Sequence, residues 1–233
     1  GIIAEIHATL PALDAVLEAL RKEGVDQVLA VGDLVGYGPH PRQVIRKLDR
    51  EGIPCVPGAA DLRVAYALPS PPREGIAETT IVWTREQLGA REMHFLRNLR
   101  SRHRYETPRG RLMAFHGSPE DPDHKVDLND AHPAEILKML ESIRSRYAVV
   151  AGKHIPFRRV VHKGVVYDPG SVGLSLGGEP GADVLILEDD IHGEIHHRFL
   201  KLPYDYGQVA FDLAAWELPE VLAEVVRQGR FPK

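Results

Sequence analysis

Five side chains of types that bind transition metals occur at or just after the ends of short apolar runs. They are Glu5, His7, Asp33, His116 and His154. Carboxylates and imidazoles suit Mn, Fe or Zn ions, whereas a chain with one cysteine cannot form a thiolate-rich site. If the fold brings these residues together, the sequence predicts a metal centre.

Asp33 lies in the stretch from Val28 to Gly38, where an apolar run ends in Gly32-Asp33. A short apolar run bounded by turn residues is typical of a buried parallel strand. Open α/β sheets bind their ligands at the carboxyl ends of such strands, so we expect the Asp33 carboxylate to face a crevice. Asp and Gly also begin ordinary turns. Other apolar runs in the chain end in similar residues, which favours Asp33 as a site residue over Asp33 as part of an ordinary turn.

Glu5 and His7 are two positions apart after the first apolar run. Residues two apart in an extended chain point to the same side, so we expect both to reach one ion. The alternative for His7, His116 and His154 is that each is an ordinary hydrogen-bonded histidine. Because all three follow apolar strands, as Asp33 does, the metal interpretation is favoured.

The first third of the chain alternates predicted strands and helices. Apolar residues at helical spacing over 11–21 predict a helix between the first strand and a strand over 28–31, which makes the two strands parallel. A second helix over about 42–50, with Gly52 as its stop, leads to a strand over 53–56. This alternation predicts an α/β fold.

Residues 62–104 break the alternation and read as helices over about 78–88 and 91–99, which we interpret as a helical cap insertion. Four arginines of this segment could contact a substrate phosphate: Arg63, Arg85, Arg97 and Arg100. The favoured alternative is a solvated face paired with glutamates.

The rest of the chain is predicted to add strands and two helices. The strands cover 111–115, 147–151, 159–162, 165–167, 183–187 and 194–199, and the helices about 133–143 and 218–227. The short spacing of the later strands predicts an antiparallel or mixed second sheet packed on the first. The loop that holds Asp121, Asp123, His124 and Asp127 contains two prolines and is predicted to be an exposed loop, not a metal cluster.

Composition excludes several classes of function. The 233 residues suit one large domain or a domain with a lid, and the formal charge of −4 gives no general attraction to a nucleic acid polymer or an anionic membrane. Cys55 is the only cysteine, which favours a cytoplasmic location. No apolar run approaches the roughly 20 residues of a membrane span, and we expect no export signal.

The order of these motifs resembles the calcineurin-like metallophosphoesterases, particularly the small bacterial and archaeal predicted phosphodiesterases. The family carries Asp-x-His, Gly-Asp, Gly-Asn-His-Asp, a lone His after a strand, and Gly-His-x-His. The corresponding segments here are Glu5-Ile6-His7, Gly32-Asp33, Gly58-Ala59-Ala60-Asp61, His116-Gly117-Ser118 and Gly152-Lys153-His154. The stretches Gly32–Pro39 and Asp168–Gly173 are further matches.

The resemblance implies one metallophosphoesterase domain over 1–233, with two packed mixed sheets flanked by helices and the cap inserted at 62–104. It implies one or two divalent ions (Mn, Fe or Zn). Asp33 would be the bridging carboxylate, the first ion would also take Glu5, His7 and His154, and the second would take His116.

The chain departs from the family pattern at several positions. Glu5 replaces Asp, Ala59 replaces an Asn ligand, and Ala60 replaces the His expected to protonate the leaving group. Asp61, the usual partner of that His, remains as a candidate catalytic residue beside Asp33. Lys153 stands near the place of a ligand His, where its ammonium group could contact a phosphate. An inert, exposed Lys153 is the open alternative.

The implied function is a metal-dependent phosphoesterase that hydrolyses a small phosphomonoester or phosphodiester, a nucleotide being one option. Activity could be reduced by Ala59 and Ala60, because losing a general acid typically costs about 10²–10⁴-fold in rate. The alternative is a non-catalytic relative that binds a phosphorylated ligand or a partner. A protein phosphatase is a weaker third option, because no extended peptide-binding feature is evident. The oligomeric state is not indicated.

Overall fold

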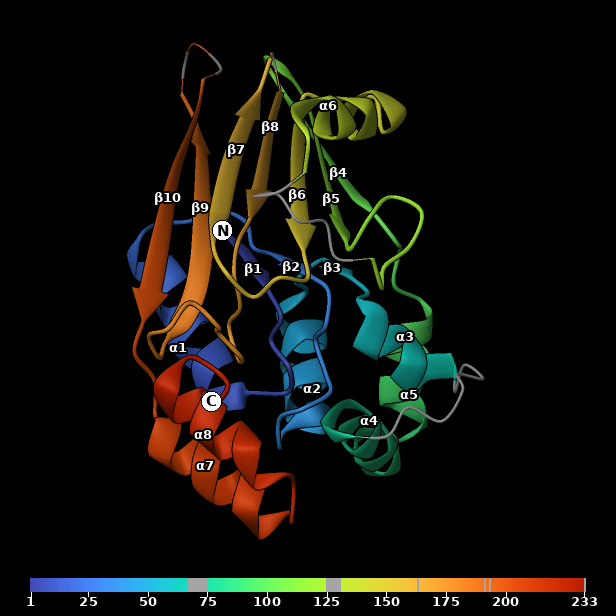
Figure 1. Ribbon diagram of the computed structural model, residues 1–233, viewed down its shortest axis with the longest axis vertical. Coiled ribbons are helices and arrows are strands. Elements are labelled where there is room, and N and C mark those ends of the chain that lie inside the picture. Colours follow the sequence, from blue (N-terminus) through green and yellow to red (C-terminus); the bar gives the residue numbers. More distant parts are fainter. Residues whose placement is uncertain (67–74, 125–130, 163, 191, 193, 233) are drawn as a thin grey trace.

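Two five-stranded β-sheets stacked face to face form the centre of the computed structural model (Figure 1). The structure describes residues 1–66, 75–124, 131–162, 164–190, 192 and 194–232. The strands are β1 (Ile2–Ala4), β2 (Leu29–Val31), β3 (Cys55–Val56), β4 (His103–Thr107), β5 (Gly110–His116), β6 (Tyr147–Ala151), β7 (Phe157–Val161), β8 (Gly164–Asp168), β9 (Ala182–Asp189) and β10 (Ile195–Leu202). The helices are α1 (Leu10–Lys22), α2 (Pro41–Glu51), α3 (Ala59–Tyr66), α4 (Ile76–Gln87), α5 (Ala90–Arg97), α6 (Pro133–Ser142), α7 (Tyr206–Ala215) and α8 (Glu220–Gln228).

The first sheet has the strand order β10-β9-β1-β2-β3, and its strands β1, β2 and β3 run parallel. Helices α1 and α2 connect them, so both predicted strand–helix–strand units are confirmed. Proline opens each helix, where its missing N–H costs nothing. Helix α2 ends at Gly52, whose φ of 64° is the left-handed conformation that glycine adopts readily.

Strands β9 and β10 belong to this first sheet, and their predicted membership of a second sheet is wrong. Strand β9 pairs antiparallel with β1 and with β10. The short spacing of β9 and β10 correctly indicated an antiparallel hairpin. It carried no information on which sheet the hairpin joins, because that depends on pairing with the distant strand β1.

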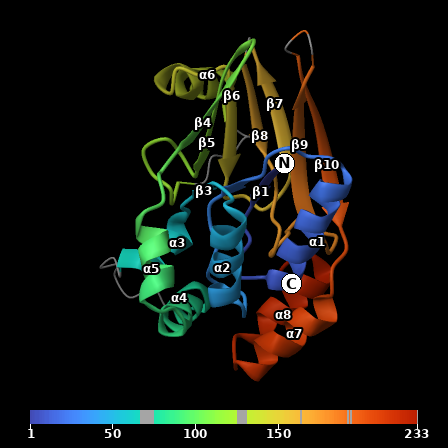
Figure 2. The same cartoon turned by 180° about the vertical axis from the view of Figure 1, so that it is seen from behind.

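The second sheet has the order β4-β5-β6-β8-β7, with β5, β6 and β8 parallel and β7 antiparallel to β8. Apolar side chains that include Ala4, Val31, Ala114 and Val149 fill the space between the sheets. Helices α1 and α2 cover the outer face of the first sheet and α6 that of the second (Figure 2). The predicted arrangement of two packed mixed sheets flanked by helices is confirmed.

Helices α4 and α5 lie in the segment predicted as a cap and pack with α3 and α2. The last two helices, α7 and α8, pack against each other and enclose a small apolar cluster of their own that includes Leu174. Helix α7 was not predicted. In the described part of the chain, no helix combines the length and the apolar character of a membrane span.

Candidate metal centre

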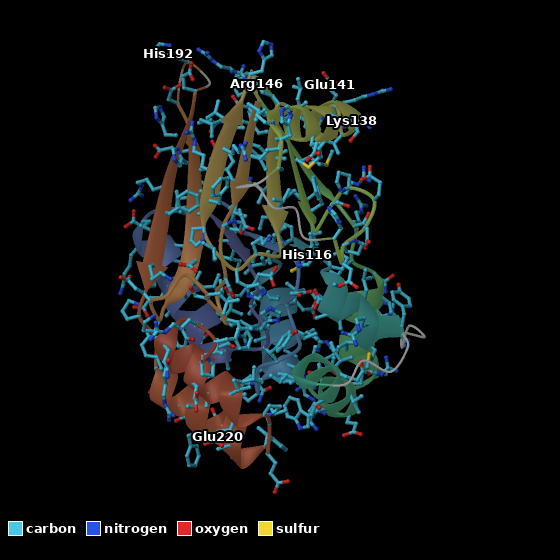
Figure 3. All side chains as sticks on the ribbon, in the orientation of Figure 1. His116, Lys138, Glu141, Arg146, His192 and Glu220 are labelled. Carbon is cyan, nitrogen blue, oxygen red and sulfur yellow. The ribbon has the colours of Figure 1, made fainter. Side chains whose placement is uncertain are left out.

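The five predicted ligands meet at the carboxyl ends of four parallel strands, two from each sheet. Glu5 and His7 follow β1, Asp33 follows β2, His116 ends β5 and His154 follows β6. All five side chains are buried. Figure 3 shows His116 between the ends of the strands and the helices below them. The two sheets together therefore bring the predicted side chains into one cluster.

The backbone at four of these ligands is left-handed. The φ angles are 51° at Glu5, 45° at His7, 48° at Asp33 and 60° at His154. Such values are uncommon outside glycine and cost free energy, so neighbouring structure must hold them. The N–H groups of Glu5 and His7 donate to the carbonyls of Gly32 and Asp33, at 3.0 and 2.9 Å.

The expectation that Glu5 and His7 converge is confirmed, but the reason given for it is wrong. Strand β1 ends at Ala4, and neither residue is extended. The two side chains meet because the chain turns at left-handed residues, and not because a strand alternates.

Two glycines leave space that the cluster needs. A Cβ atom on Gly32 would lie 2.3 Å from Cδ2 of His116, and one on Gly58 would lie 2.1 Å from Oδ1 of Asp33. Gly32 also has a φ of 76°. Any side chain at either position would displace a ligand.

Glu5 lies at the middle of the cluster. Its Oε2 is 2.9 Å from Nε2 of His7 and 3.3 Å from Nε2 of His154. Its Oε1 is 2.8 Å from Nε2 of His116, which lies 3.7 Å from Oδ2 of Asp33. Two groups of ligand atoms close enough to hold an ion result: the first triad, Glu5–His7–His154, and the second triad, Glu5–Asp33–His116.

The residues fit divalent cations. Among the described residues, Oε2 of Glu5 and both ring nitrogens of His7 are buried and make no hydrogen bond of acceptable geometry, although Oε2 lies 2.9 Å from Nε2 of His7. Such atoms are costly unless something satisfies them. An ion in the first triad would satisfy two of these atoms.

Protonated histidine supplies positive charge beside the carboxylates of the cluster. Burial opposes the charge on Glu5, but His154 and His116 hold the pKa of this carboxyl well below its usual range. Burial also opposes protonation of His116, yet the charges of Asp33 and Glu5 raise the pKa of His116 to about 10. The cluster therefore stabilises positive charge between its carboxylates, as a metal site must.

Backbone carbonyls orient two of the histidines. Nδ1 of His154 donates to the carbonyl of Leu174 at 2.9 Å, which turns Nε2 toward Glu5. Nδ1 of His116 lies 2.8 Å from the carbonyl of Pro122. Such bonds to the second ring nitrogen fix ring orientation at metal sites.

A buried loop after β8 supports the first triad, and the sequence analysis did not assign it a role. The hydroxyl of Ser171 donates to the carbonyl of Glu5 at 2.9 Å and accepts from the N–H of Leu174 at 2.8 Å. The Asp183 carboxylate in turn accepts from the N–H of Ser171 at 3.3 Å and lies 2.8 Å from Nζ of Lys201. The quoted stretch Asp168–Gly173 was the available signal, but the contact that links it to the triad, from Ser171 to Glu5, joins residues far apart in the sequence.

Asp61 and Lys153 lie outside the two triads. The Asp61 carboxylate is fully buried and accepts from the N–H groups of Leu34, Val35 and Gly58 at 2.9–3.1 Å. These bonds brace the loop that carries Asp33. Lys153 is half-buried, and its backbone N–H bonds to the Asp168 carboxylate.

A cavity of about 160 Å³ opens over the second triad. Asp33, His116 and His154 lie on one side, and Ala59, Ala60, Tyr37 and Arg63 are among the other lining residues. Lys153 is not among the described residues that line it. The guanidinium of Arg63 pairs with Glu78 of α4. We therefore place Arg63, and not Lys153, at this cavity as the basic side chain.

The loop residues predicted as exposed behave largely as expected. Asp121, Asp123 and His124 are exposed, although Asp123 also lines the cavity. Asp127 lies outside the described residues. A larger cavity of about 640 Å³ lies where the two sheets splay apart, beside Leu29 and Leu112. It contains none of the five candidate ligands, so we place the chemistry in the smaller cavity.

The model of the calcineurin-like phosphoesterase superfamily domain matches residues 1–190. An uncharacterized protein of Methanocaldococcus jannaschii is 26% identical over 246 residues, which cover 99% of this chain and 98% of that protein. A hypothetical protein from Pyrococcus horikoshii OT3 has a similar fold, with a TM-score of 0.87, 22% identity, and coverage of 99% of this chain and 98% of that one. For a metallophosphoesterase from Sphaerobacter thermophilus the TM-score is 0.81 at 24% identity, with coverage of 98% and 97%. The predicted fold is confirmed, and the chain belongs to the calcineurin-like phosphoesterase superfamily.

Proposed function

We propose that the protein is a metal-dependent phosphoesterase that hydrolyses a small phosphomonoester or phosphodiester. One observation carries the proposal: two triads of buried ligand side chains lie beside a cavity that Arg63 also lines. Buried carboxylates and imidazoles in this density are costly to the fold and are typical of functional sites.

Divalent ions at the triads would neutralise phosphoryl oxygens and activate water. The chain itself would bind and orient the substrate. Arg63 is suited to hold a phosphoryl oxygen, because a guanidinium forms strong, directional bonds with phosphate. Burial and the charge of Asp33 raise the pKa of Tyr37, so its phenol stays a hydrogen-bond donor.

The size of the cavity favours a small substrate. Its volume of about 160 Å³ is below that of a typical ligand pocket, which is about 300–1,000 Å³. It has room for a phosphoryl group and part of a leaving group. Ala59 and Ala60 line the cavity with smaller side chains than the Asn and His of the family pattern, and neither can donate a proton. Esters with good leaving groups should therefore react best.

The same two alanines favour a second candidate, a non-catalytic protein that binds a phosphorylated ligand. Both line the cavity, where the family pattern has a ligand Asn and an acidic His. A binding protein would need the cation of Arg63 and the metal sites but no proton donor.

The test is hydrolysis of aryl and alkyl phosphate mono- and diesters by metal-stripped protein reloaded separately with Mn, Zn, Fe or Mg. We expect metal-dependent turnover that disappears in Asp33→Ala. Because no proton reaches the leaving group, aryl esters should react faster than alkyl esters by about 10²–10⁴-fold. Tight metal and phosphate binding without turnover of any ester would instead support the binding protein.

A further inference from the structure

We propose that the organic group of the phosphoester substrate is short, uncharged and apolar. The proposal rests on the proposed function and narrows it to one class of phosphoester. It is drawn from the wall of the cavity that helices α3 and α4 form, and not from the side that carries the candidate metal ligands.

Four aliphatic side chains form this wall. Helix α3 contributes Ala59 and Ala60, and helix α4 contributes Ala77 and Ile81. A methyl or methylene group beside them leaves water without losing any hydrogen bond. A hydroxyl group in the same place would lose its bonds to water, because these side chains neither donate nor accept. The wall therefore favours an aliphatic or aromatic group over a sugar.

The polar side chains of the cavity suit the phosphoryl group instead. Within the described part of the chain, those that line the cavity are the three candidate ligands Asp33, His116 and His154, together with Tyr37, Arg63 and Asp123. The proposed function already assigns Tyr37 and Arg63 to the phosphoryl group. The carboxylate of Asp123 would repel a second anionic group, such as the further phosphates of a nucleotide. The organic group should therefore be uncharged.

The aliphatic wall is held in place by the packing around it. Ala60 and Ile81 belong to the main hydrophobic core. A Cβ atom on Gly36 would lie 3.3 Å from Cβ of Ala60 and 3.6 Å from Cδ1 of Ile81, so the Gly36 backbone packs against both side chains. The ion pair of Arg63 with Glu78 also joins α3 to α4. The cavity of about 160 Å³ therefore stays small, whereas a nucleoside is of the size that fills pockets of about 300–1,000 Å³.

The experiment measures the binding of phosphonates, in which carbon replaces the scissile oxygen, so that affinity is read without turnover. Full-length protein equilibrated with Mn²⁺ is titrated calorimetrically with methylphosphonate, propylphosphonate and 2-hydroxyethylphosphonate. The last two differ only by a hydroxyl group in place of a methyl group. The variant Ala77→Leu fills space at the wall, and the control Val82→Leu lengthens an exposed side chain of the same helix. Thermal unfolding checks each fold.

We expect the wild type and Val82→Leu to bind propylphosphonate about 15-fold more tightly than methylphosphonate, because each buried methylene contributes about fourfold. Both should also bind propylphosphonate more tightly than 2-hydroxyethylphosphonate. In Ala77→Leu the advantage of propyl over methyl should disappear while methylphosphonate still binds. If Ala77→Leu does not fold, the three wild-type affinities decide the question.

Several results would overturn the inference. They are equal wild-type affinities for the methyl and propyl compounds, a preference for the hydroxyethyl compound, binding of none of the three, or a propyl preference that persists in Ala77→Leu. Any of them together with metal-dependent hydrolysis of esters would leave the proposed function standing. A propyl preference that Ala77→Leu removes, without turnover of any ester, would keep the inference about the ligand and overturn the proposed hydrolysis.

Discussion

At the scale of single residues, Arg63 is the cation that helix α3 presents beside the candidate centre. We predict that Arg63→Gln raises KM for an aryl phosphate about 10-fold, because a hydrogen bond between charged groups contributes about 1.5–3 kcal/mol. Steady-state kinetics with saturating Mn²⁺ would measure this. The bound metal should not change, because Arg63 belongs to neither triad.

The matched control is Arg91→Gln, which removes a guanidinium paired with Asp49 on the exposed face of α5. Its KM should equal that of the wild type. Equal KM values for Arg63→Gln and Arg91→Gln would show that Arg63 does not contact the substrate and is only the partner of Glu78.

The residue types of the site could be predicted from the sequence, but their conformations could not. Glu5, His7, Asp33, His116 and His154 are visible as ligand types after apolar runs. The left-handed angles at Glu5 and His7 depend on hydrogen bonds to Gly32 and Asp33, more than 20 positions away. Local patterns contain no information about such contacts.

At the scale of elements, the loop between β8 and β9 acts as a support for the first triad. We predict that Ser171→Ala lowers Mn²⁺ affinity about 10–100-fold, the usual effect of losing a group that orients ligands. Removing the hydroxyl also leaves the buried N–H of Leu174 without its acceptor, which should cost about 1–3 kcal/mol of unfolding free energy.

Isothermal titration of stripped protein with Mn²⁺ would measure the affinity, and denaturant unfolding the stability. Ser142→Ala is the control, because that hydroxyl bonds to a carbonyl on an exposed part of α6. If the two variants bind Mn²⁺ equally well, the loop supports the fold alone and not the triad.

Element positions were largely predictable where patterns are local. Helices α1 and α2 carry their own start and stop signals in Pro11, Pro41 and Gly52. The assignment of β9 and β10 failed because strand partners are chosen through distant pairing. Helix α7 was not predicted: a final helix was placed over 218–227, and no element was assigned to residues 206–215.

At the scale of the whole molecule, stability should depend on pH through Asp168. Burial raises the pKa of this carboxyl to about 8, although the N–H of Gly170 opposes the shift. The folded chain therefore keeps a proton that the unfolded chain releases above about pH 4. This contribution is full at acid pH and is lost as the pH rises toward 8, at up to about 1.4 kcal/mol per pH unit.

We predict that Asp168→Asn flattens this loss between pH 5.5 and 8.5, because an amide cannot ionise. Denaturant unfolding of metal-stripped protein across that range would measure the slope. The exposed Asp189→Asn is the control and should keep the wild-type slope. Parallel slopes for Asp168→Asn and the wild type would mean that Asp168 is ionised in the folded chain throughout the range.

The position of β1 between β2 and β9 also has a consequence for protein synthesis. Strand β1 leaves the ribosome well before its partner β9, which ends at Asp189. Until then the nascent chain lacks one neighbour of β1, and Ser171 and Asp183 cannot yet support Glu5. Metal uptake at the first triad should therefore wait until β9 has been synthesised and has paired with β1.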